Sequence, residues 1–318
     1  MARRVLVTGA AGVVGEETVL ELLRRPDRYE VVAFDLPLGH VRRRLKQFQG
    51  KADIVLGDLR EPADVARALQ GVDAVIHLAA MIPPRADHEP EEASSINLGG
   101  TRTLLEEIKQ TGRQIRLLHM SSISVYGDRL KDFWIEVGDP IQPSPHDHYG
   151  ETKVLGEQEV RKSGLPWTIF RLTGVMSHRI EMSPLMFHMP LETKFEIITS
   201  RDTGYAMVQA LEKDGLEQKI FNLAGGPRCR ATYREVLDRH LSIMGLGTGL
   251  IPDEAFAEGN FHCGFYRDSE ELDALIGHHR DGLDEWFQAV KDRVNPLLPM
   301  LAGAFKPVAR WYFTSRSE

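Results

Sequence analysis

Residues 3–15 read R-R-V-L-V-T-G-A-A-G-V-V-G, and this stretch decides the fold. Residues 5–7 form a short apolar, largely β-branched run bounded by glycine, which is typical of a buried strand. Residues 8–15 then turn the chain with the spacing T-G-x-x-G-x-x-G, and residues 16–25 continue with helical composition. Glycines in such a turn let the backbone approach a pyrophosphate, and the N-terminus of the following helix attracts the same anion. The stretch therefore predicts a strand, a phosphate-binding turn and a helix, with a plain glycine-rich turn as the alternative.

Length and composition limit the classes of protein to be considered. The chain has 318 residues, a net charge of −7 and a sequence pI near 6.0, so it offers no general attraction to nucleic acid. Its two cysteines, Cys229 and Cys263, are far apart and lack a metal-ligand pattern, which indicates a reducing compartment. No apolar run is long enough to span a bilayer, and no signal peptide precedes the first strand. We expect a cytoplasmic protein with no membrane or nucleic-acid partner.

Runs with strand character alternate with helical stretches. Strands are predicted at residues 5–7, 30–35, 53–56, 73–78, 115–120 and 167–171, and helices at 16–25, 41–48, 62–69, 91–111 and 148–162. This alternation predicts an α/β protein with a Rossmann-type doubly wound parallel sheet that is covered by helices on both faces. Ligands of such sheets bind beyond the C-terminal ends of the strands, where the motifs described here fall.

Asp35 ends the second predicted strand and indicates the type of dinucleotide. Its carboxylate can accept hydrogen bonds from both adenosine ribose hydroxyls and repels a 2′-phosphate, which favours NAD over NADP. Residues 42–44 are all arginine and are the counter-evidence, since guanidinium groups bind phosphate. A turn-capping role for Asp35 before Pro37 is compatible with the same geometry. Asp58 is expected to reach the adenine edge, and residues 78–80 to pass beneath the cofactor.

The later part of the chain predicts a smaller C-terminal substrate-binding α/β portion. Strands are predicted at residues 196–199 and 219–223, and helices at 203–212, 232–244, 270–276 and 283–294. Asp202 is expected to cap the helix that begins at residue 203. We expect residues 1–176 to form the NAD-binding domain and residues 177–318 to form mainly the substrate-binding portion, with some segments returning to the sheet.

Two segments carry the candidate chemistry, S-S-I-S-V-Y-G at residues 121–127 and Y-G-E-T-K at residues 149–153. Tyr149 and Lys153 are four residues apart and project from one face of a helix. An adjacent ammonium group, together with the positive charge of an oxidised nicotinamide, is expected to lower the pKa of Tyr149. Tyr149 would then exchange a proton with a substrate oxygen that Ser122 holds by a hydrogen bond. A surface helix with a solvated lysine is the alternative interpretation.

These motifs together resemble those of the extended short-chain dehydrogenase/reductases, in the NAD-dependent epimerase/dehydratase group. The resemblance is close over residues 3–176 and rests on residues 8–15, Asp35, G-D-L at 57–59, H-L-A-A at 77–80, N-L-G-G-T at 97–101, and the two segments above with Glu157. It implies catalytic Ser122, Tyr149 and Lys153, and an Asn97 that helps to position the lysine through water. It also implies a substrate pocket built by the C-terminal part, and homodimers that pair through a four-helix interface.

The predicted site comprises two sets of residues besides Ser122. We expect NAD to be bound by Thr8, Gly9, Gly12, Val13, Val14, Gly15, Asp35, Leu36, Asp58, Leu59, Leu78, Ala79, Ala80, Asn97, Tyr149, Lys153 and Leu172. The candidate substrate residues are Ile82, Ser124, His148, Thr173, Met182, Met186 and Arg228. No metal site is expected, because His146 and His148 lack a carboxylate or cysteine partner at ligand spacing.

Departures from the family pattern narrow the reaction. Sugar-nucleotide 4,6-dehydratases carry Asp-Glu directly after the serine or threonine, whereas this chain has Ile123 and Ser124, so dehydration is not expected. The first interpretation is hydride transfer between a carbinol or ketone carbon and NAD, with a nucleotide sugar as substrate of a 4-epimerase. The methionine-rich segment 176–189 supports a less polar substrate instead, as in a hydroxysteroid-like or alcohol dehydrogenase or a ketone reductase. A non-catalytic NAD-sensing regulator and a structural or RNA-associated relative are further alternatives.

Overall fold

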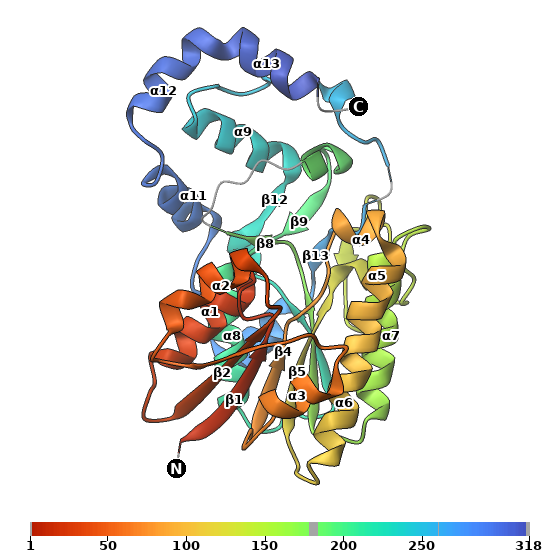
Figure 1. Cartoon of the computed structure of the whole chain (residues 1–318). Coiled ribbons are helices and arrows are strands. Elements are labelled where there is room, and N and C mark those ends of the chain that lie inside the picture. The colour runs from red at the N-terminus through yellow and green to blue at the C-terminus, as the bar shows by residue number, and fades with distance from the viewer. Residues whose placement is uncertain (1, 178–183, 260, 316–318) are drawn as a thin grey trace.

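Seven parallel strands form the centre of the molecule (Figure 1). The computed structural model describes residues 2–177, 184–259 and 261–315. In spatial order the strands are β11 (Lys219–Leu223), β7 (Trp167–Leu172), β5 (Arg116–Ser122), β4 (Ala74–His77), β1 (Arg3–Thr8), β2 (Tyr29–Asp35) and β3 (Asp53–Leu56). The strand order reverses beside β1, which is the point where doubly wound sheets bind their ligands.

Alternation within the strands divides the core into two layers. Successive side chains point to opposite faces of a strand, so Val5 and Val7 belong to one apolar cluster and Leu6 to the other. The first layer packs under α1 (Val13–Leu23), α2 (Gly39–Leu45), α8 (Ser200–Glu212) and α10 (Ser269–Ile276). The second packs under α3 (Pro62–Ala68), α6 (Gly100–Gln110) and α7 (His148–Lys162). The α/β class and the parallel sheet that the sequence predicts are both confirmed.

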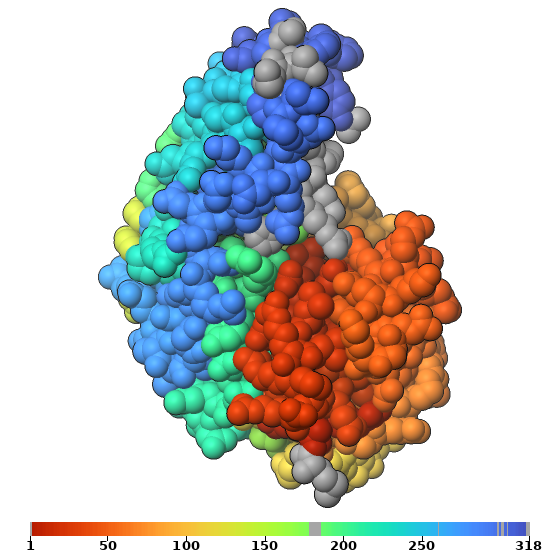
Figure 2. Space-filling model, turned by 90° about the vertical axis from the view of Figure 1, so that its left-hand side faces the viewer, coloured from red at the N-terminus to blue at the C-terminus, as the bar shows by residue number. Residues whose placement is uncertain are grey.

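A smaller portion lies beyond the C-terminal ends of the strands (Figure 1). It contains three short strand pairs, antiparallel β9 (Lys194–Glu196) with β12 (Arg230–Thr232), and parallel β8 (Val175–Met176) with β10 (Ile198–Thr199) and β6 (Trp134–Ile135) with β13 (Phe265–Tyr266). Its helices are α9 (Tyr233–Ile243), α11 (Leu283–Lys291), α12 (Leu297–Ala302) and α13 (Lys306–Thr314). Figure 2 shows these C-terminal helices above the first elements of the chain.

Several element boundaries differ from the predicted ones. The helix predicted at 91–111 is divided into α5 (Pro90–Ser94), a π-helical turn at Ser95–Gly99, and α6, and the short helix α4 (Arg85–His88) precedes it. The single strand predicted at 196–199 is two strands, β9 and β10, with different partners. The prediction that Asp202 caps α8 is wrong. Thr199 is the cap, because its Oγ1 accepts the Asp202 N–H at 3.1 Å.

Elements from both parts of the sequence share the central sheet. β11 follows residue 176 in the chain and pairs with β7, and α8 packs against α1. A division at residue 176 therefore does not separate two structural units, because segments after this residue belong to the central sheet and to the helical layer that covers it. Among the described residues, no helix combines the length and the apolar character that crossing a bilayer requires.

Candidate active site

The glycine-rich turn after β1 brings three backbone segments into close contact. Gly9 has φ +70°, and a Cβ added there would lie 2.8 Å from the Cα of Ala79. A Cβ added to Gly15 would lie 2.0 Å from the Gly9 carbonyl oxygen. Only glycine fits at these two positions, so the turn can lie directly against the start of α1. Gly12 precedes α1 without a side-chain capping bond, which leaves the first N–H groups of the helix free to face an anion.

Asp35 is fixed beside this turn at the end of β2. Its two carboxylate oxygens accept the backbone N–H groups of Ala11 and Leu36, each at 2.8 Å. Arg44 donates to the Ala11 carbonyl at 3.1 Å, so it braces the turn. Burial raises the pKa of Asp35, and the two backbone hydrogen bonds oppose that effect. The carboxylate is therefore held against the glycine-rich turn at the end of β2.

Thr8 and Asn97 use their side chains to hold the backbone of the site. The Thr8 hydroxyl lies 2.8 Å from Nδ1 of His77 and accepts the N–H groups of Leu78 and Ala79 at 3.2 Å. Asn97 lies in the π-helical turn, where its amide binds both backbone groups of Met81 and the hydroxyl of Thr152. Both side chains are buried and internally paired. These hydrogen bonds hold the segment that follows β4 in place beside the glycine-rich turn.

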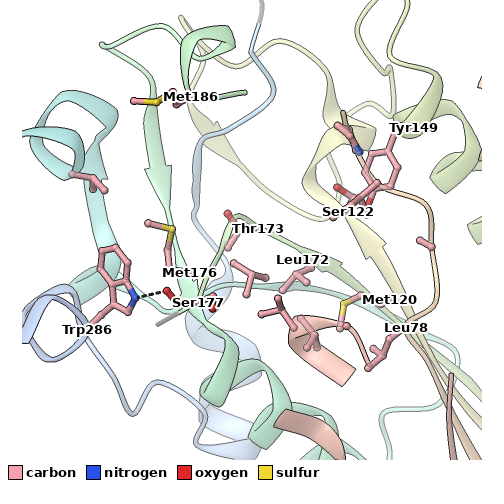
Figure 3. Close-up of a pocket in the computed structure, with 18 of the residues that line it drawn as sticks. Leu78, Met120, Ser122, Tyr149, Leu172, Thr173, Met176, Ser177, Met186 and Trp286 are labelled. Carbon is pink, nitrogen blue, oxygen red and sulfur yellow. Dashed lines mark hydrogen bonds between the residues drawn. The ribbon is translucent and has the colours of Figure 1, made fainter. Parts of the chain in front are cut away.

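A cavity of about 680 Å³ opens from the glycine-rich turn toward the C-terminal helices (Figure 3). Fourteen of the predicted residues line it, namely Gly9, Gly12, Val13, Val14, Gly15, Leu78, Ala80, Ile82, Ser122, Tyr149, Lys153, Leu172, Thr173 and Met186. The hydroxyl of Thr173 is buried in this lining with no hydrogen-bond partner among the described residues. The structure therefore brings the predicted cofactor turn, the predicted catalytic residues and part of the predicted substrate set to one cavity.

Other predicted residues lie outside this lining. Thr8, Asp35, Leu36, Asp58, Leu59, Ala79, Asn97, Ser124, His148 and Arg228 are not part of it, and Met182 lies outside the described residues. Asp58 is held in a fork by Arg60. Arg228 pairs with Glu285 at 2.8 Å. These ion pairs use the charged groups that the sequence analysis assigned to adenine and to substrate.

Ser122, Tyr149 and Lys153 meet at the C-terminal end of β5. Ser122 is the last residue of that strand, and its Oγ accepts the Ser124 N–H at 3.2 Å. Tyr149 and Lys153 lie on the first turns of α7, which Asp147 caps by accepting the Gly150 N–H at 2.7 Å. The Lys153 ammonium donates to the Met120 carbonyl at 3.0 Å and lies 5.5 Å from the centre of the Tyr149 ring.

Burial controls the pKa of both titratable groups. It raises the pKa of Tyr149 to about 12, against a hydrogen bond with Ser122 that lowers it. It lowers the pKa of Lys153 to about 8, against the charge of Glu157 that raises it. The predicted lowering of the Tyr149 pKa requires an oxidised nicotinamide as well as the ammonium of Lys153. In the protein without NAD, burial has the largest effect on the pKa of Tyr149 and raises it.

A buried polar network supports this site from behind. Arg171 on β7 forms a fork with Glu157 on α7, with Nε–Oε1 and Nη2–Oε2 distances of 3.0 and 2.8 Å. Ser121 also donates to Glu157, and Arg171 continues to the hydroxyl of Tyr126 at 2.8 Å. Tyr126 in turn donates to Asn222 on β11 at 2.7 Å. The network ties the helix of Tyr149 and Lys153 to three neighbouring strands.

The far wall of the cavity comes from α9 and α11, which the sequence analysis did not assign to the site. One stripe of α9 lines the cavity, with Tyr233, Val236, Leu237, His240, Leu241 and Met244. The spacing i, i+3, i+4, i+7, i+8 and i+11 was the available signal, since it places all six on one helical face. Trp286 and Val290 of α11 complete the wall (Figure 3). The His240 ring packs 4.8 Å from that of Trp286, and burial lowers the pKa of His240.

The fold and the cavity define a dinucleotide-binding α/β protein of the short-chain dehydrogenase/reductase type, with the Ser, Tyr and Lys of that class at the strand ends. The model of the "NAD dependent epimerase/dehydratase family" matches residues 5–224. The chain belongs to this family, whose cofactor is NAD. Its glycine turn and helix N-terminus fit that cofactor.

Curated relatives match part of the chain. D-erythronate dehydrogenase of Cupriavidus necator is 34% identical over 158 residues, covering 48% of each chain. Human sterol-4-alpha-carboxylate 3-dehydrogenase, decarboxylating, is 32% identical over 180 residues, or 56% of this chain and 45% of that protein. Mouse 3 beta-hydroxysteroid dehydrogenase type 7 is 33% identical over 159 residues, or 49% and 43%. The chain spans about half the length of the curated relatives it matches.

Solved structures share the fold over nearly the whole chain. UDP-glucuronic acid 4-epimerase from Bacillus cereus, in complex with UDP-glucuronic acid and NAD, has a TM-score of 0.74 at 22% identity, covering 92% of this chain and 100% of that chain. UDP-glucose 4-epimerase of Thermus thermophilus, in complex with NAD, has a TM-score of 0.74 at 23% identity, covering 91% and 98%. Likeness at this level of identity shows the Rossmann-type architecture.

Proposed function

We propose that the protein is an NAD-dependent oxidoreductase that moves a hydride between NAD and the carbinol or ketone carbon of a weakly polar substrate. The observation that carries this proposal is the wall of the cavity opposite Tyr149. That wall consists of Met176, Met186, Tyr233, Leu237, Leu241, Met244, Trp286 and Val290, with the half-buried His240. Binding of a substrate against this wall is favoured because it removes apolar surface of both from water.

A nucleotide sugar fits this wall less well, because its diphosphate needs cationic partners. Among the described residues of the lining, Lys153 is the single lysine or arginine, and it lies at the catalytic end. The two arginines of the nearby turn are already paired, Arg228 with Glu285 at 2.8 Å and Arg230 with Glu196 at 2.7 Å. Several curated relatives are named as dehydrogenases, two of them of sterols or steroids. The epimerase structures support the fold of the proposed enzyme.

The roles of the chain's own groups follow from their positions. We propose that Ser122 and Tyr149 hold the substrate oxygen, and that Tyr149 gives or takes the proton on it. Lys153, which lies on the same helix, places a positive charge 5.5 Å from the centre of the Tyr149 ring and helps to orient the phenol. The unpaired Thr173 hydroxyl offers one more polar contact within an otherwise apolar lining. NAD, when bound on the glycine turn, supplies hydride acceptance or donation at the substrate carbon.

The test is a substrate screen with a tyrosine variant. Purified protein is assayed by nicotinamide absorbance against apolar secondary alcohols and ketones, and by sugar interconversion against UDP-sugars. We expect turnover of an apolar alcohol or ketone, and a fall in kcat of about 10²- to 10⁴-fold in Tyr149→Phe, with NAD affinity retained. Tyr205→Phe, on α8 and outside the cavity lining, is the matched control. Interconversion of UDP-sugars without turnover of apolar alcohols would establish the epimerase instead.

A second variant tests the wall directly. Leu237→Gln places an amide on the α9 stripe, where leucine now faces the cavity. We expect the KM for an apolar substrate to rise about 10-fold, corresponding to about 1.4 kcal/mol, with kcat retained. An unchanged KM would show that this face of α9 does not contact the substrate.

We further propose that the enzyme is a cytoplasmic homodimer in which residues 1–176 bind mainly NAD and residues 177–318 mainly substrate. The reduced thiols Cys229 and Cys263, both buried and free, support a reducing location. Leu155 on α7 is an exposed large apolar side chain, which is the kind of residue that a helical dimer interface would cover. Light scattering is expected to give twice 35.8 kDa, and Leu155→Glu to halve that mass. A monomeric mass for the wild type would refute the dimer.

A further inference from the structure

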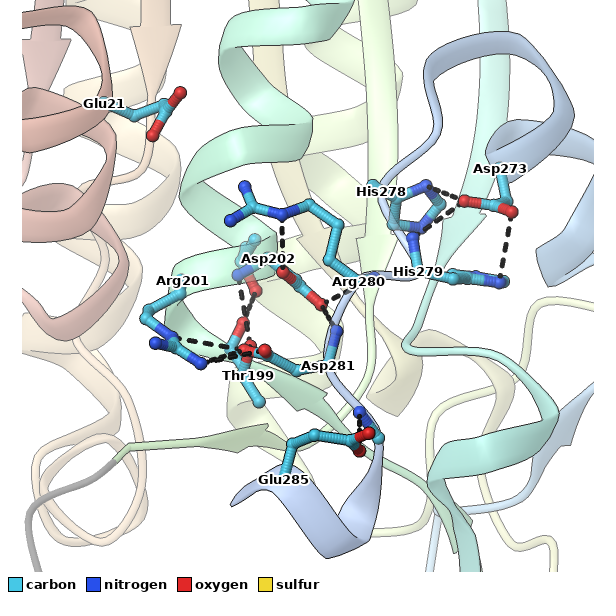
Figure 4. A network of polar contacts seen from close by, with 12 residues as sticks. Glu21, Thr199, Arg201, Asp202, Asp273, His278, His279, Arg280, Asp281 and Glu285 are labelled. Carbon is cyan, nitrogen blue, oxygen red and sulfur yellow. Dashed lines mark hydrogen bonds and ion pairs between the residues drawn. The ribbon is translucent and has the colours of Figure 1, made fainter. Parts of the chain in front are cut away.

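Three potential metal ligands meet where α10 ends, away from the catalytic cavity (Figure 4). Asp273 lies in the last turns of α10, and His278 and His279 follow the left-handed Gly277 that ends the helix. One ligand atom from each of the three side chains lies within 4.8 Å of the others. The turn at Gly277 thus brings the imidazole rings of His278 and His279 next to the carboxylate of Asp273.

The hydrogen bonding of His278 fixes which ring nitrogen carries the proton. Its Nε2 lies 3.0 Å from the Ala224 carbonyl oxygen, which can only accept, so Nε2 carries the hydrogen. The side chain is wholly buried, which favours the neutral ring. Nδ1 therefore presents a lone pair, and it has no hydrogen-bond partner among the described residues.

That lone pair faces another electron-rich atom. Nδ1 of His278 is 3.6 Å from Oδ1 of Asp273, and Nδ1 of His279 is 3.6 Å from Oδ2. A separation of 3.6 Å is too long for a hydrogen bond. It is close to the spacing of about 3.4 Å between two donors that share a tetrahedral metal at about 2.0–2.2 Å. A cation between these atoms turns mutual repulsion into coordination.

The surroundings match those of a metal-binding histidine. Such a histidine normally donates its second ring N–H to a carbonyl or a carboxylate, as His278 does to Ala224. The His279 ring packs directly against the backbone of Gly226, where an added Cβ would lie 2.3 Å from its Nδ1, and this contact fixes the position of the ring. Asp273 also accepts the backbone N–H of His279 at 2.7 Å, which orients the carboxylate toward the rings.

We propose that Asp273, His278 and His279 bind one Zn²⁺ ion, with water completing a tetrahedral site. Two imidazoles and one carboxylate are a donor set that zinc prefers. The ion would join the end of α10 to the end of β11 through Ala224. The same segment leads into α11, which carries Trp286 and Val290 to the cavity wall. The role is therefore a structural clamp on the substrate-binding portion. The expectation of no metal site considered His146 and His148 and did not consider the D-x4-H-H spacing.

The test is metal binding by protein purified without a histidine tag. We expect about one zinc per chain by elemental analysis, and the visible spectrum of non-octahedral Co²⁺ after exchange. Zn²⁺ added to metal-free protein should raise Tm, because it binds the folded state. Asp273→Asn and His279→Gln should weaken Zn²⁺ binding by more than the ~10–100-fold that losing an outer hydrogen-bond partner costs.

Controls separate this site from adventitious binding. His88→Gln, at an exposed position of α4, should leave the stoichiometry and the affinity unchanged. His278→Gln removes a wholly buried ring, so the half-buried Asp273 and His279 keep the test decisive if that variant does not fold. No bound zinc and no rise in Tm, or binding that Asp273→Asn and His279→Gln leave unchanged, would overturn the proposal.

Discussion

Lys153 is expected to destabilise the fold that it serves. Its pKa falls from 10.5 to about 8 because its ammonium is buried. Because each pKa unit corresponds to somewhat more than 1 kcal/mol, this difference corresponds to about 3 kcal/mol against the charged folded state. Lys153→Met removes that penalty and also the hydrogen bond to Met120, which is worth about 1 kcal/mol. The variant should therefore be inactive and about 2 kcal/mol more stable than the wild type at pH 7.

The stability difference between Lys153→Met and the wild type is expected to depend on pH. Between pH 8 and 10.5 the unfolded chain keeps the lysine proton that the folded chain has released, so wild-type stability rises with pH in that window. The penalty on Lys153 falls from about 3 kcal/mol at pH 7 to about 1 kcal/mol at pH 9.5. The advantage of Lys153→Met should therefore nearly vanish at pH 9.5.

The assay is urea denaturation of both proteins at pH 7.0 and 9.5, supported by thermal unfolding. For 318 residues the unfolding entropy is about 0.67 kcal/mol/K, so 2 kcal/mol raises Tm by about 3 °C. Lys162→Met, at an exposed position of the same helix, should change the stability by less than about 0.5 kcal/mol. A Lys153→Met protein that is no more stable than the wild type at pH 7, or whose advantage does not change with pH, would refute the reasoning.

Three further changes probe the support of the site. Glu157→Gln leaves the buried Arg171 without its carboxylate partner and should lower the free energy of unfolding, measured by urea denaturation, by about 3–5 kcal/mol. Glu159 pairs with Arg102 at the surface, so a similar loss of stability in Glu159→Gln would show that burial of the ion pair is not the cause. Gly9→Ala forces a Cβ to within 2.8 Å of Ala79 and should weaken NAD binding at least ~10-fold by calorimetry; unchanged affinity would remove the turn from the site. Asp35→Ala should lower the preference for NAD over NADP in the same measurement, and an unchanged ratio would exclude Asp35 from ribose recognition.

The nucleotide-binding half could be predicted because its signals are local. Each strand is a short run whose side chains alternate between two packed faces, as Leu6 does between Val5 and Val7. The glycines that open α1 are needed within the same turn. Element types follow from such patterns. The ends of the helices and strands are predicted less well, because they depend on contacts with distant residues. Asp202 does not cap α8, since its carboxylate accepts backbone N–H groups of the chain after α10, and Thr199 is the cap instead.

The cavity wall could be predicted only in part. The stripe of α9 is legible as one helical face, but a single sequence does not tell whether that face meets a core or a cavity. The network that holds Glu157 joins residues far apart in the chain, such as Tyr126 and Asn222. Such pairings are set by the strand order, and β11 reaches its place beside β7 only after the chain has left the sheet and returned.

The effect of burial on the pKa of Tyr149 could not be predicted from the sequence either. The sequence places an ammonium beside a phenol but does not show how dry their surroundings are. In the folded protein one apolar cavity raises the pKa of Tyr149 to about 12 and lowers that of Lys153 to about 8. At neutral pH the pair therefore rests as a phenol with an ammonium, which is the form that donates a proton to a ketone oxygen. We expect the positive charge of an oxidised nicotinamide, together with the ammonium of Lys153, to favour the phenolate when Tyr149 acts as a base.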